Sequence, residues 1–205
     1  MTELLRERNR RGEGSRLRAD ILAGATQLLE QTGSEEAVTL RAVARQVGIS
    51  APSIYPHFPD REAIVDAIVN DAFSDFNSAI TGAADAALGP VARLRAGCAA
   101  YLRFAAERPQ RYKLLFERRN LINDSAVPVP SVRTESFEVL VTCVQDCIDA
   151  GISASTDAQL DSKAIWVALH GYATLHALLP LFPWPDPDAL LDRLIDGLAQ
   201  ISRLD

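Results

Sequence analysis

Residues 39–62 hold two short helical patterns on either side of a glycine, and this arrangement constrains the fold more than any other feature of the chain. Thr39 is suited to cap a first helix, in which Val43 and Val47 recur at helical spacing. Gly48 stands where that helix must end, because glycine accepts the positive φ of a sharp turn at little cost. The pattern predicts a helix, a tight turn and a second helix.

The second helix of this segment has the composition of a surface that approaches DNA. Ser50 is suited to cap it, and Pro52 falls in its first turn, where a missing N–H costs little. Ile54 and Phe58 are expected to face inward, which leaves small residues, hydroxyl groups and a ring on the outer face. Such a face lets the backbone come close to phosphates and base edges. We therefore predict DNA binding; the alternative is an αα-hairpin in a helical protein with another role.

These residues resemble the DNA-binding domain of the TetR family of transcriptional regulators. The resemblance covers residues 16–75 and rests above all on Tyr-x-His-Phe at 55–58, followed by Asp-Arg-Glu at 60–62. Arg61 stands where the family more often has lysine and keeps a cation for phosphate, whereas Pro56 is unusual and is expected to stiffen the exit from the recognition helix. The other matching positions are Thr39, Ala44, Gly48, Ile49, Ser50 and Ile54.

Several residues of this segment are candidates for DNA contact. Thr39 and Arg41 lie at the start of the first helix, where free amides and a nearby cation suit a phosphate. The resemblance implies phosphate-clamping roles for Tyr55, His57 and Arg61, although His57 could instead pack over Phe58 and form only an internal hydrogen bond. The predicted DNA-binding residues are Thr39, Arg41, Ser50, Ala51, Ser53, Tyr55, His57 and Arg61.

Charge is unevenly distributed along the chain, whose net charge is −6. Residues 1–61 carry nine arginines against eight acids, whereas residues 62–205 carry twelve basic residues against nineteen acids. This balance permits local DNA contact by the N-terminal part. We expect a disordered arginine-rich arm at 1–14, a helix-turn-helix domain at 15–61, and an effector-binding and dimerisation domain at 62–205 that starts with a connecting helix at 62–80. The arginines of the arm either follow an adjacent groove or stay solvated.

Helical periodicity continues along the rest of the chain, and no window alternates with a period of two, so the predicted fold class is all-α. Residues 164–185 carry no charge and exceed the roughly 20 residues that span a bilayer, but their histidines, glycine and prolines favour a helix buried on several sides. Loops are expected at 81–90 and 118–130. Helices are expected at 15–33, 60–80, 91–107, 109–117, 131–150, 157–179 and 188–203.

The second half also resembles one group of TetR-type effector domains. Trp166 followed by His170-Gly171 is similar to the Trp…His-Gly element of that group, and residues 104–116 match it as well. This resemblance implies about nine helices and dimerisation through the last two long ones. A dimer is also needed to read a palindrome, whose half-sites lie about one helical turn (~34 Å) apart. The ridge of Ala164, Ala168 and Gly171 allows close approach; alternatively, these helices close the core of the monomer.

Aromatic residues of the second half could line a pocket for a small, largely apolar effector. Each of them could equally be an ordinary core residue, and the polar His170 could serve a core hydrogen bond. The predicted ligand-binding residues are Phe104, Tyr112, Phe116, Phe137, Trp166 and His170.

The remaining chemistry of the sequence points away from catalysis. Cys143 and Cys147 lie one helical turn apart, but a zinc site needs about two further ligands, so we interpret both as buried small hydrophobes. No phosphate loop, carboxylate pair or nucleophile motif is present, and we expect no cofactor, no metal and no enzymatic activity. An odd number of cysteines and a charged N-terminus without an apolar core predict a cytoplasmic protein, associated with the nucleoid when bound to DNA.

Together these features predict a transcriptional regulator, more specifically a repressor, that binds a palindromic operator as a homodimer and is released by an apolar effector. One alternative is a DNA-binding regulator with no small-molecule effector. A second is a helical enzyme or carrier that has lost DNA binding.

Overall fold

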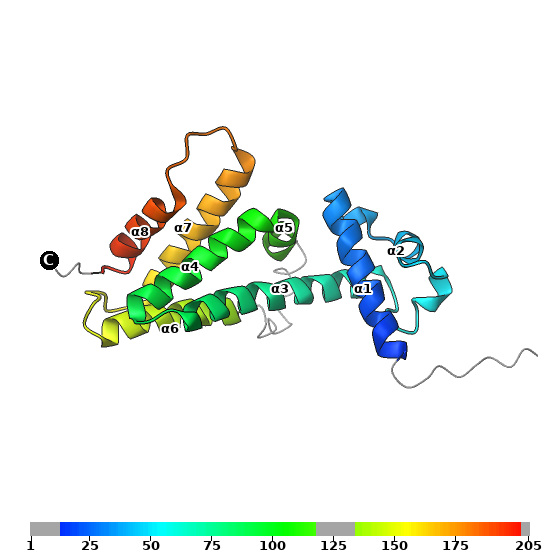
Figure 1. The fold of residues 1–205 in the computed structure, drawn as a ribbon, viewed down its shortest axis with the longest axis horizontal. Coiled ribbons are helices and arrows are strands. Elements are labelled where there is room, and N and C mark those ends of the chain that lie inside the picture. The colour runs from blue at the N-terminus through cyan, green and yellow to red at the C-terminus, as the bar shows by residue number, and fades with distance from the viewer. Residues whose placement is uncertain (1–12, 118–133, 202–205) are drawn as a thin grey trace, which may run out of the picture. The chain divides into compact units, whose positions relative to one another are not determined.

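The computed structural model describes residues 13–117 and 134–201. These residues form eight α-helices and two 3-10 helices (Figure 1), with one isolated β-bridge between Ser153 and Ile201. The predicted all-α fold is therefore confirmed. By its contacts the chain divides into two compact units, residues 1–71 and 72–205.

The first unit contains α1 (Glu13–Thr32), the 3-10 helix η1 (Glu35–Ala37), α2 (Leu40–Val47), the 3-10 helix η2 (Ala51–Ser53) and the start of α3 (Arg61–Ala86). Helix α1 packs on α2 so closely that a Cβ added at Gly24 would lie 2.5 Å from Val47 Cγ2. Because the Val47 side chain is β-branched and stiff, only glycine fits at this crossing. The fully buried side chains of the unit are Ile21, Ala25, Val38, Val43, Ile54, Phe58, Ile64, Val65, Ile68 and Val69.

The ends of the helices in this unit follow from local chemistry. Thr39 caps α2 as predicted, because its Oγ1 accepts a hydrogen bond of 3.2 Å from the Ala42 N–H. Gly48 ends α2 in the left-handed region, with φ 75°. The Asp60 carboxylate accepts from the Ala63 N–H at 2.8 Å and so caps α3.

The segment after Gly48 differs from the prediction. Ser50 makes no side-chain cap; its hydroxyl is instead hydrogen-bonded to that of Ser53 at 2.8 Å. In place of a second α-helix there is a single 3-10 turn, η2, followed by turns to His57. Pro56 explains the difference, because it has no N–H to donate to the carbonyl of Pro52 and an α-helical ladder cannot continue.

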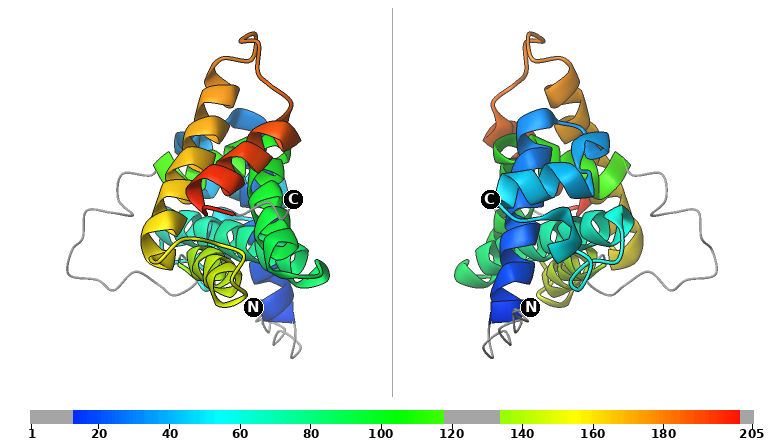
Figure 2. Two further views of the ribbon diagram at one scale, coloured as in Figure 1. Left: turned by 90° about the vertical axis from the view of Figure 1, so that its left-hand side faces the viewer. Right: turned by 90° about the vertical axis from the view of Figure 1, so that its right-hand side faces the viewer.

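The second unit comprises the remainder of α3 with α4 (Pro90–Glu107), α5 (Pro109–Glu117), α6 (Glu135–Asp149), α7 (Ala158–Leu178) and α8 (Pro187–Leu198). Helix α4 packs against α5, α6, α7 and α8, and α7 also packs against α6 and α8 (Figure 2). The most deeply buried large side chains are Phe76, Leu94, Ile165 and Leu191. Helix α4 is therefore the central element of the core.

Two boundaries in this unit differ from the prediction, and a third lies outside the described residues. The loop expected at 81–90 begins only after Ala86, because its alanines favour a helix and Ala84 is fully buried. The last helix, expected to continue to 203, ends at Leu198. Beyond it Gln200 takes a positive φ of 49°, and Ile201 forms a β-bridge with Ser153. Helix α6 begins at Glu135, and the expected start at 131 lies outside the described residues, as do the loop at 118–130 and most of the arm.

Helix α7 is more exposed than the sequence suggested. Its Leu160, Val167 and Leu178 are 61%, 64% and 69% exposed, whereas Ile165 and Leu169 are buried against the core. The prediction of burial on several sides is therefore wrong for this chain taken alone. Among the described residues, no helix combines the length and apolarity needed to cross a membrane.

Candidate DNA-binding face and effector pocket

In the first unit, the turn after η2 holds an aromatic side chain toward solvent. Ile54 and Phe58 are buried, and the Phe58 N–H donates to the Ile54 carbonyl at 2.9 Å. Between these two anchors, Tyr55 is 56% exposed. The segment is short, but its conformation is fixed on both sides of Tyr55, so that the ring and its hydroxyl are available to a partner.

Helix α2 carries two exposed cations. Arg41 and Arg45 lie one helical turn apart, both are exposed, and neither forms an ion pair with any part of the chain that is described. The predicted residue Arg41 thus has an accessible charge. Arg45 was missed, although its spacing of four residues from Arg41 is a signal that the sequence contains.

Arg61 is held inside the first unit. Its guanidinium donates to the Glu35 carbonyl oxygen at 2.7 Å and to the Glu62 carboxylate at 2.6 Å. Arg18 lies over the Phe58 ring, 4.7 Å from its centroid, in a cation–π arrangement. His57 is half-buried, and its backbone N–H donates to the Ile54 carbonyl. A phosphate contact by Arg61 would have to compete with these internal bonds.

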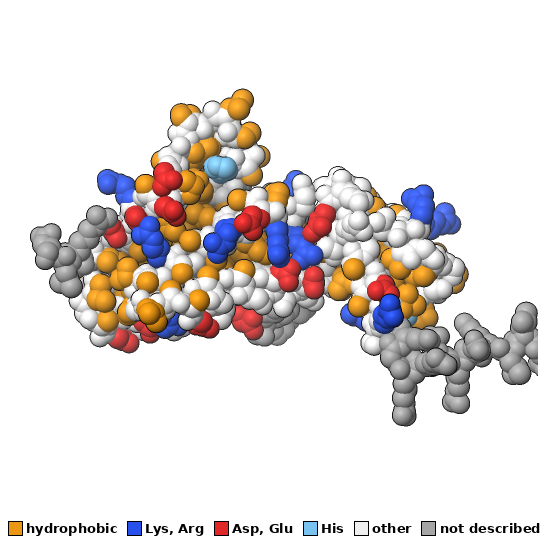
Figure 3. Space-filling model, viewed as in Figure 1, with side chains coloured by type: hydrophobic (Ala, Val, Ile, Leu, Met, Phe, Trp, Pro, Cys, Tyr) orange, Lys and Arg blue, Asp and Glu red, His pale blue; other side chains and the backbone are white. Residues whose placement is uncertain are grey.

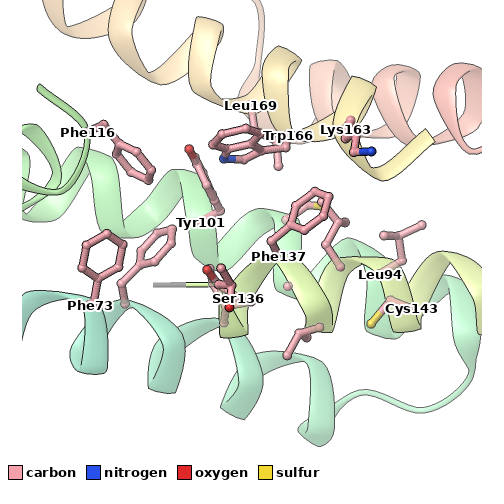
Figure 4. Close-up of a pocket in the computed structure, with 17 residues that line it drawn as sticks. Phe73, Leu94, Tyr101, Phe116, Ser136, Phe137, Cys143, Lys163, Trp166 and Leu169 are labelled. Atoms are coloured by element: carbon pink, nitrogen blue, oxygen red, sulfur yellow. The ribbon is translucent and has the colours of Figure 1, made fainter. Parts of the chain in front are cut away.

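In the second unit, five helices surround an apolar cavity of about 370 Å³. Its walls come from α3, α4, α5, α6 and α7 (Figure 4). Aromatic rings form much of the wall, with Leu94, Leu140 and Leu169 between them. The rings are those of Phe73, Phe76, Tyr101, Phe116, Phe137 and Trp166.

A hydrogen-bonded polar layer lies behind the Tyr101 wall. The Tyr101 and Tyr112 hydroxyls are 2.9 Å apart, and the Tyr112 hydroxyl is 2.8 Å from His170 Nδ1. Burial raises the pKa of Tyr112 to about 12 and raises the pKa of Tyr101 as well. Both tyrosines are therefore neutral at physiological pH. Because α4, α5 and α7 each supply one member, this layer ties the three helices together.

The polar groups of the cavity wall are few and almost all uncharged. Among the described residues of the lining, Lys163 is the one with a charged side chain. Cys98 and Cys143 also line it, and burial raises the pKa of both, to about 12 for Cys98, so the thiols act as small apolar groups. No group of three or more potential metal ligands lies among the described residues.

Two family models match the chain. The model of the bacterial regulatory proteins of the tetR family matches residues 21–68, and that of the tetracyclin repressor-like C-terminal domain matches residues 94–198. The chain belongs to the TetR family. Members of this family are DNA-binding regulators and not enzymes, so this TetR-family protein is a DNA-binding transcriptional regulator.

Solved structures share the fold of this TetR-family chain. A protein of unknown function from Rhodococcus sp. RHA1 is 27% identical, with a TM-score of 0.78 over 97% of this chain and 98% of that one. A regulatory protein of the tetR family from Rhodococcus RHA1 is 21% identical, with a TM-score of 0.68 over 92% and 98%. The nucleoid occlusion factor SlmA of Photobacterium profundum is 28% identical over 92 residues, and the match spans 47% of its length and 45% of this chain.

The structure brings together only part of the predicted ligand set. Phe116, Phe137 and Trp166 line the cavity, whereas Phe104, Tyr112 and His170 do not. Phe104 is buried in the core, 5.1 Å from Phe76 between ring centroids, and the other two belong to the polar layer described above. Sequence reasoning missed Phe73 and Phe76 as wall residues, because helical spacing shows only that they lie on the apolar side of a helix.

Helix α5 links the cavity wall to α3. Phe116 of α5 lines the cavity, and Arg111 on the same helix is paired with the Asp75 carboxylate of α3. Arg108, which follows α4, reaches the same carboxylate at 3.0 Å. Displacement of α5 by a bound molecule would therefore act directly on α3, the helix that continues into the first unit.

The solvent side of α7 carries an apolar stripe with helical spacing. Its large exposed residues are Leu160, Val167, Leu175 and Leu178, and Ala164 and Gly171 lie between them. A Cβ added at Gly171 would meet no atom within 4 Å, which leaves room for close approach by another helix. Figure 3 shows further hydrophobic side chains where α7 ends and the chain turns toward α8, at the top of the view.

Proposed function

We propose that this protein is a repressor that binds a palindromic operator as a homodimer and is released by a small, largely apolar effector. The observation that carries the ligand response is the apolar cavity of about 370 Å³ in the second unit. This volume lies in the range of small-molecule sites, about 300–1,000 Å³. On this proposal the protein acts in the cytoplasm and associates with the nucleoid when it is bound to DNA.

Contact with the operator is assigned to the exposed face of the first unit. The exposed Tyr55 and the accessible Arg41 support this assignment, and Arg45 joins them. The amides at the start of α2 suit a phosphate, since Thr39 satisfies only one of the free N–H groups. The other residues assigned to this contact are Ser50, Ala51, Ser53 and His57, whereas Arg61 would first have to leave its bonds to Glu35 and Glu62.

The apolar stripe of α7 supports the homodimer. Val167 lies at the middle of the stripe and is 64% exposed, so a charge there would be buried against the partner copy. We expect Val167→Glu to shift the protein to monomers in sedimentation equilibrium, whereas Gln159→Glu on the same helix leaves the dimer intact. A Val167→Glu protein that remains a dimer of wild-type affinity would place the interface elsewhere.

Release requires the effector to prefer one arrangement of the dimer. To invert a balance of 1:99, the ligand must bind the released state about 10⁴-fold better. The link from the cavity through Phe116, Arg111 and Asp75 to α3 provides a physical route for this preference. A regulator without an effector, the alternative, is expected to have no solvent-accessible cavity between Phe104, Phe137 and Trp166. Phe137 and Trp166 line the cavity of the second unit, although Phe104 does not, and the cavity counts against this alternative.

Selection of bound duplexes from a random library, at a stated salt concentration, tests the operator half of the proposal. An enriched palindrome with half-sites about one helical turn apart is the expected result. A true binder also loses affinity steeply as salt rises, because bound counterions are released from DNA. Absence of any enrichment, from protein shown to be folded and dimeric, would reject the operator proposal.

A cavity-filling substitution tests the effector half. Val139 of α6 lines the cavity and is half-buried, so Val139→Phe reduces the free volume without adding a charge. We expect this variant to bind the selected operator with wild-type affinity and to resist release by compounds that release the wild type. Val141, on the same helix but outside the lining, provides the matched control Val141→Phe.

A further inference from the structure

We propose that the effector is an amphipathic anion, whose apolar body fills the aromatic cavity and whose single carboxylate pairs with Lys163. This inference rests on the proposed function and names the chemical class of the ligand. It also makes Lys163 the residue that determines charge specificity, a role that no aromatic wall residue can supply.

The body of the ligand follows from the composition of the wall. Phenylalanine, leucine and isoleucine side chains dominate the lining, and the Tyr101 hydroxyl is already hydrogen-bonded to Tyr112. The other hydroxyl groups of the described lining are those of Thr134 and Ser136, at the start of α6. A polar group on the body of the ligand that reaches neither of them would lose its hydration without gaining a partner, which costs roughly 1–3 kcal/mol per group in proteins. The part of the ligand that lies among the rings is therefore hydrocarbon.

The size of the ligand follows from the volume. Each water molecule occupies about 30 Å³ in the liquid, so a cavity of about 370 Å³ has room for on the order of a dozen non-hydrogen atoms. A saturated chain of about ten carbons with one head group fits this space. A long-chain lipid or a compound with several rings would need the walls to move apart.

The head group follows from Lys163. Its side chain is exposed, it lines the cavity, and no carboxylate of the described residues pairs with it. Figure 4 shows Lys163 at one end of the cavity, beyond Trp166, whereas Phe73 and Phe116 lie at the other end. An elongated ligand can therefore place its hydrocarbon end between the phenylalanines and a carboxylate beside the Lys163 ammonium group.

The lining also argues against a cationic ligand. The described residues that line it include no aspartate or glutamate, so a bound cation would find no counter-ion among them and would be repelled by Lys163. Aromatic faces do attract quaternary ammonium groups, which makes such a ligand the physical rival. The rival and the proposal differ in the sign of the preferred charge, and this difference is measurable.

Three probes of matched length separate the possibilities: decanoate, decanol and decyltrimethylammonium. The chain has two tryptophans, so Trp184→Phe leaves Trp166 in the cavity wall as the sole tryptophan, whose fluorescence can be excited selectively. We expect fluorescence titration to give about two- to fivefold tighter binding of decanoate than of decanol, the range for an exposed charge pair. Decyltrimethylammonium should bind most weakly.

Substitution of Lys163 tests its role directly. In Lys163→Gln the preference for decanoate over decanol should disappear while the affinity for decanol stays within about twofold. In Lys163→Glu the order should reverse in favour of decyltrimethylammonium. Lys113→Gln is the matched control, because Lys113 is the other lysine of the chain and does not line the cavity.

Lysine acetylation with mass spectrometry gives an independent readout on the wild-type protein. Decanoate should protect Lys163 from acetylation and leave Lys113 unchanged, whereas decanol should protect Lys163 less. Four results would each overturn the proposal of an amphipathic anion. They are equal affinity for the acid and the alcohol, survival of the acid preference in Lys163→Gln, a preference for the ammonium compound, and failure of all three probes to bind. The selection of duplexes does not depend on these probes, so failure of the proposed regulator would be seen separately.

Discussion

The two candidate sites of this protein are built in opposite ways. Tyr55 in the first unit is presented by its neighbours in sequence, because buried Ile54 and Phe58 hold the turn from both sides. The cavity of the second unit has no such local frame; its wall is assembled from five helices, from Phe73 to Leu169. The first site therefore depends on a few anchors, and the second depends on the packing of a whole helical layer.

The comparison predicts that loss of one anchor has the largest effect. Phe58 is buried, and replacing it with alanine leaves a cavity in a small core, at a cost of about 3–5 kcal/mol. In Phe58→Ala the first unit should therefore unfold or loosen at a lower urea concentration than the second. Hydrogen exchange, measured separately in each unit, checks this. The control is Phe182→Ala, which truncates an exposed ring. If α2 in Phe58→Ala is protected from hydrogen exchange as well as in the wild type, residues other than Ile54 and Phe58 also hold the turn that presents Tyr55.

Alkaline pH should act on the second unit instead. Burial raises the pKa of Cys98 from 9.0 and of Tyr112 from 10.0, each to about 12, and both residues lie in that unit. A raised folded-state pKa gives stability that is complete below the unfolded value and is lost as pH climbs toward the folded value. We expect the free energy of unfolding to fall from about pH 9 to 12, and Tyr112→Phe with Cys98→Ala to flatten this fall. A pH-independent second unit would contradict the tight packing of these groups.

Tyr55→Ala separates presentation of the site from its use. Because Tyr55 is 56% exposed, its truncation should leave the melting temperature nearly unchanged. Operator affinity should fall by about 1–3 kcal/mol, as for loss of a specific contact, in fluorescence anisotropy at fixed salt. Tyr55→Phe distinguishes the ring from the hydroxyl group. If Tyr55→Ala binds the operator with full affinity, the DNA-binding face lies elsewhere on the first unit.

The contrast also explains which features were visible in the sequence. The helix-turn-helix pattern, the cap at Thr39 and the turn at Gly48 depend on residues a few positions apart, and spacing revealed them. The walls formed by Phe73 and Lys163 depend on helices that are far apart in sequence and meet only after folding. Tyr112 and His170 were predicted to bind the ligand, but their side chains belong to the polar layer and not to the cavity wall. The rotation of a helix about its own axis decides this, and packing sets that rotation.

Local chemistry also had limits within the first unit. Ser50 had the right residue type for a cap, but its hydroxyl pairs with Ser53 and the helix after it is a 3-10 turn. Arg61 matched a phosphate-binding position, yet it is bonded to Glu35 and Glu62. A side chain with two possible partners cannot be assigned from spacing alone, since the outcome depends on which partner the fold brings nearer.

The smallest expected effect distinguishes the two kinds of arginine on the first unit. Arg45 is exposed on α2 without an ion pair to any described residue, so Arg45→Ala should weaken binding about equally for all DNA sequences and lower the salt slope by about one. Arg61→Ala should instead remove the hydrogen bond to the Glu35 carbonyl and reduce stability by about 0.5–1.5 kcal/mol. Affinity measured over a range of salt concentrations, together with urea unfolding, separates the two outcomes. A lower salt slope in Arg61→Ala with no loss of stability would show that Arg61 leaves its internal partners to bind phosphate, and the DNA face would then extend to the start of α3.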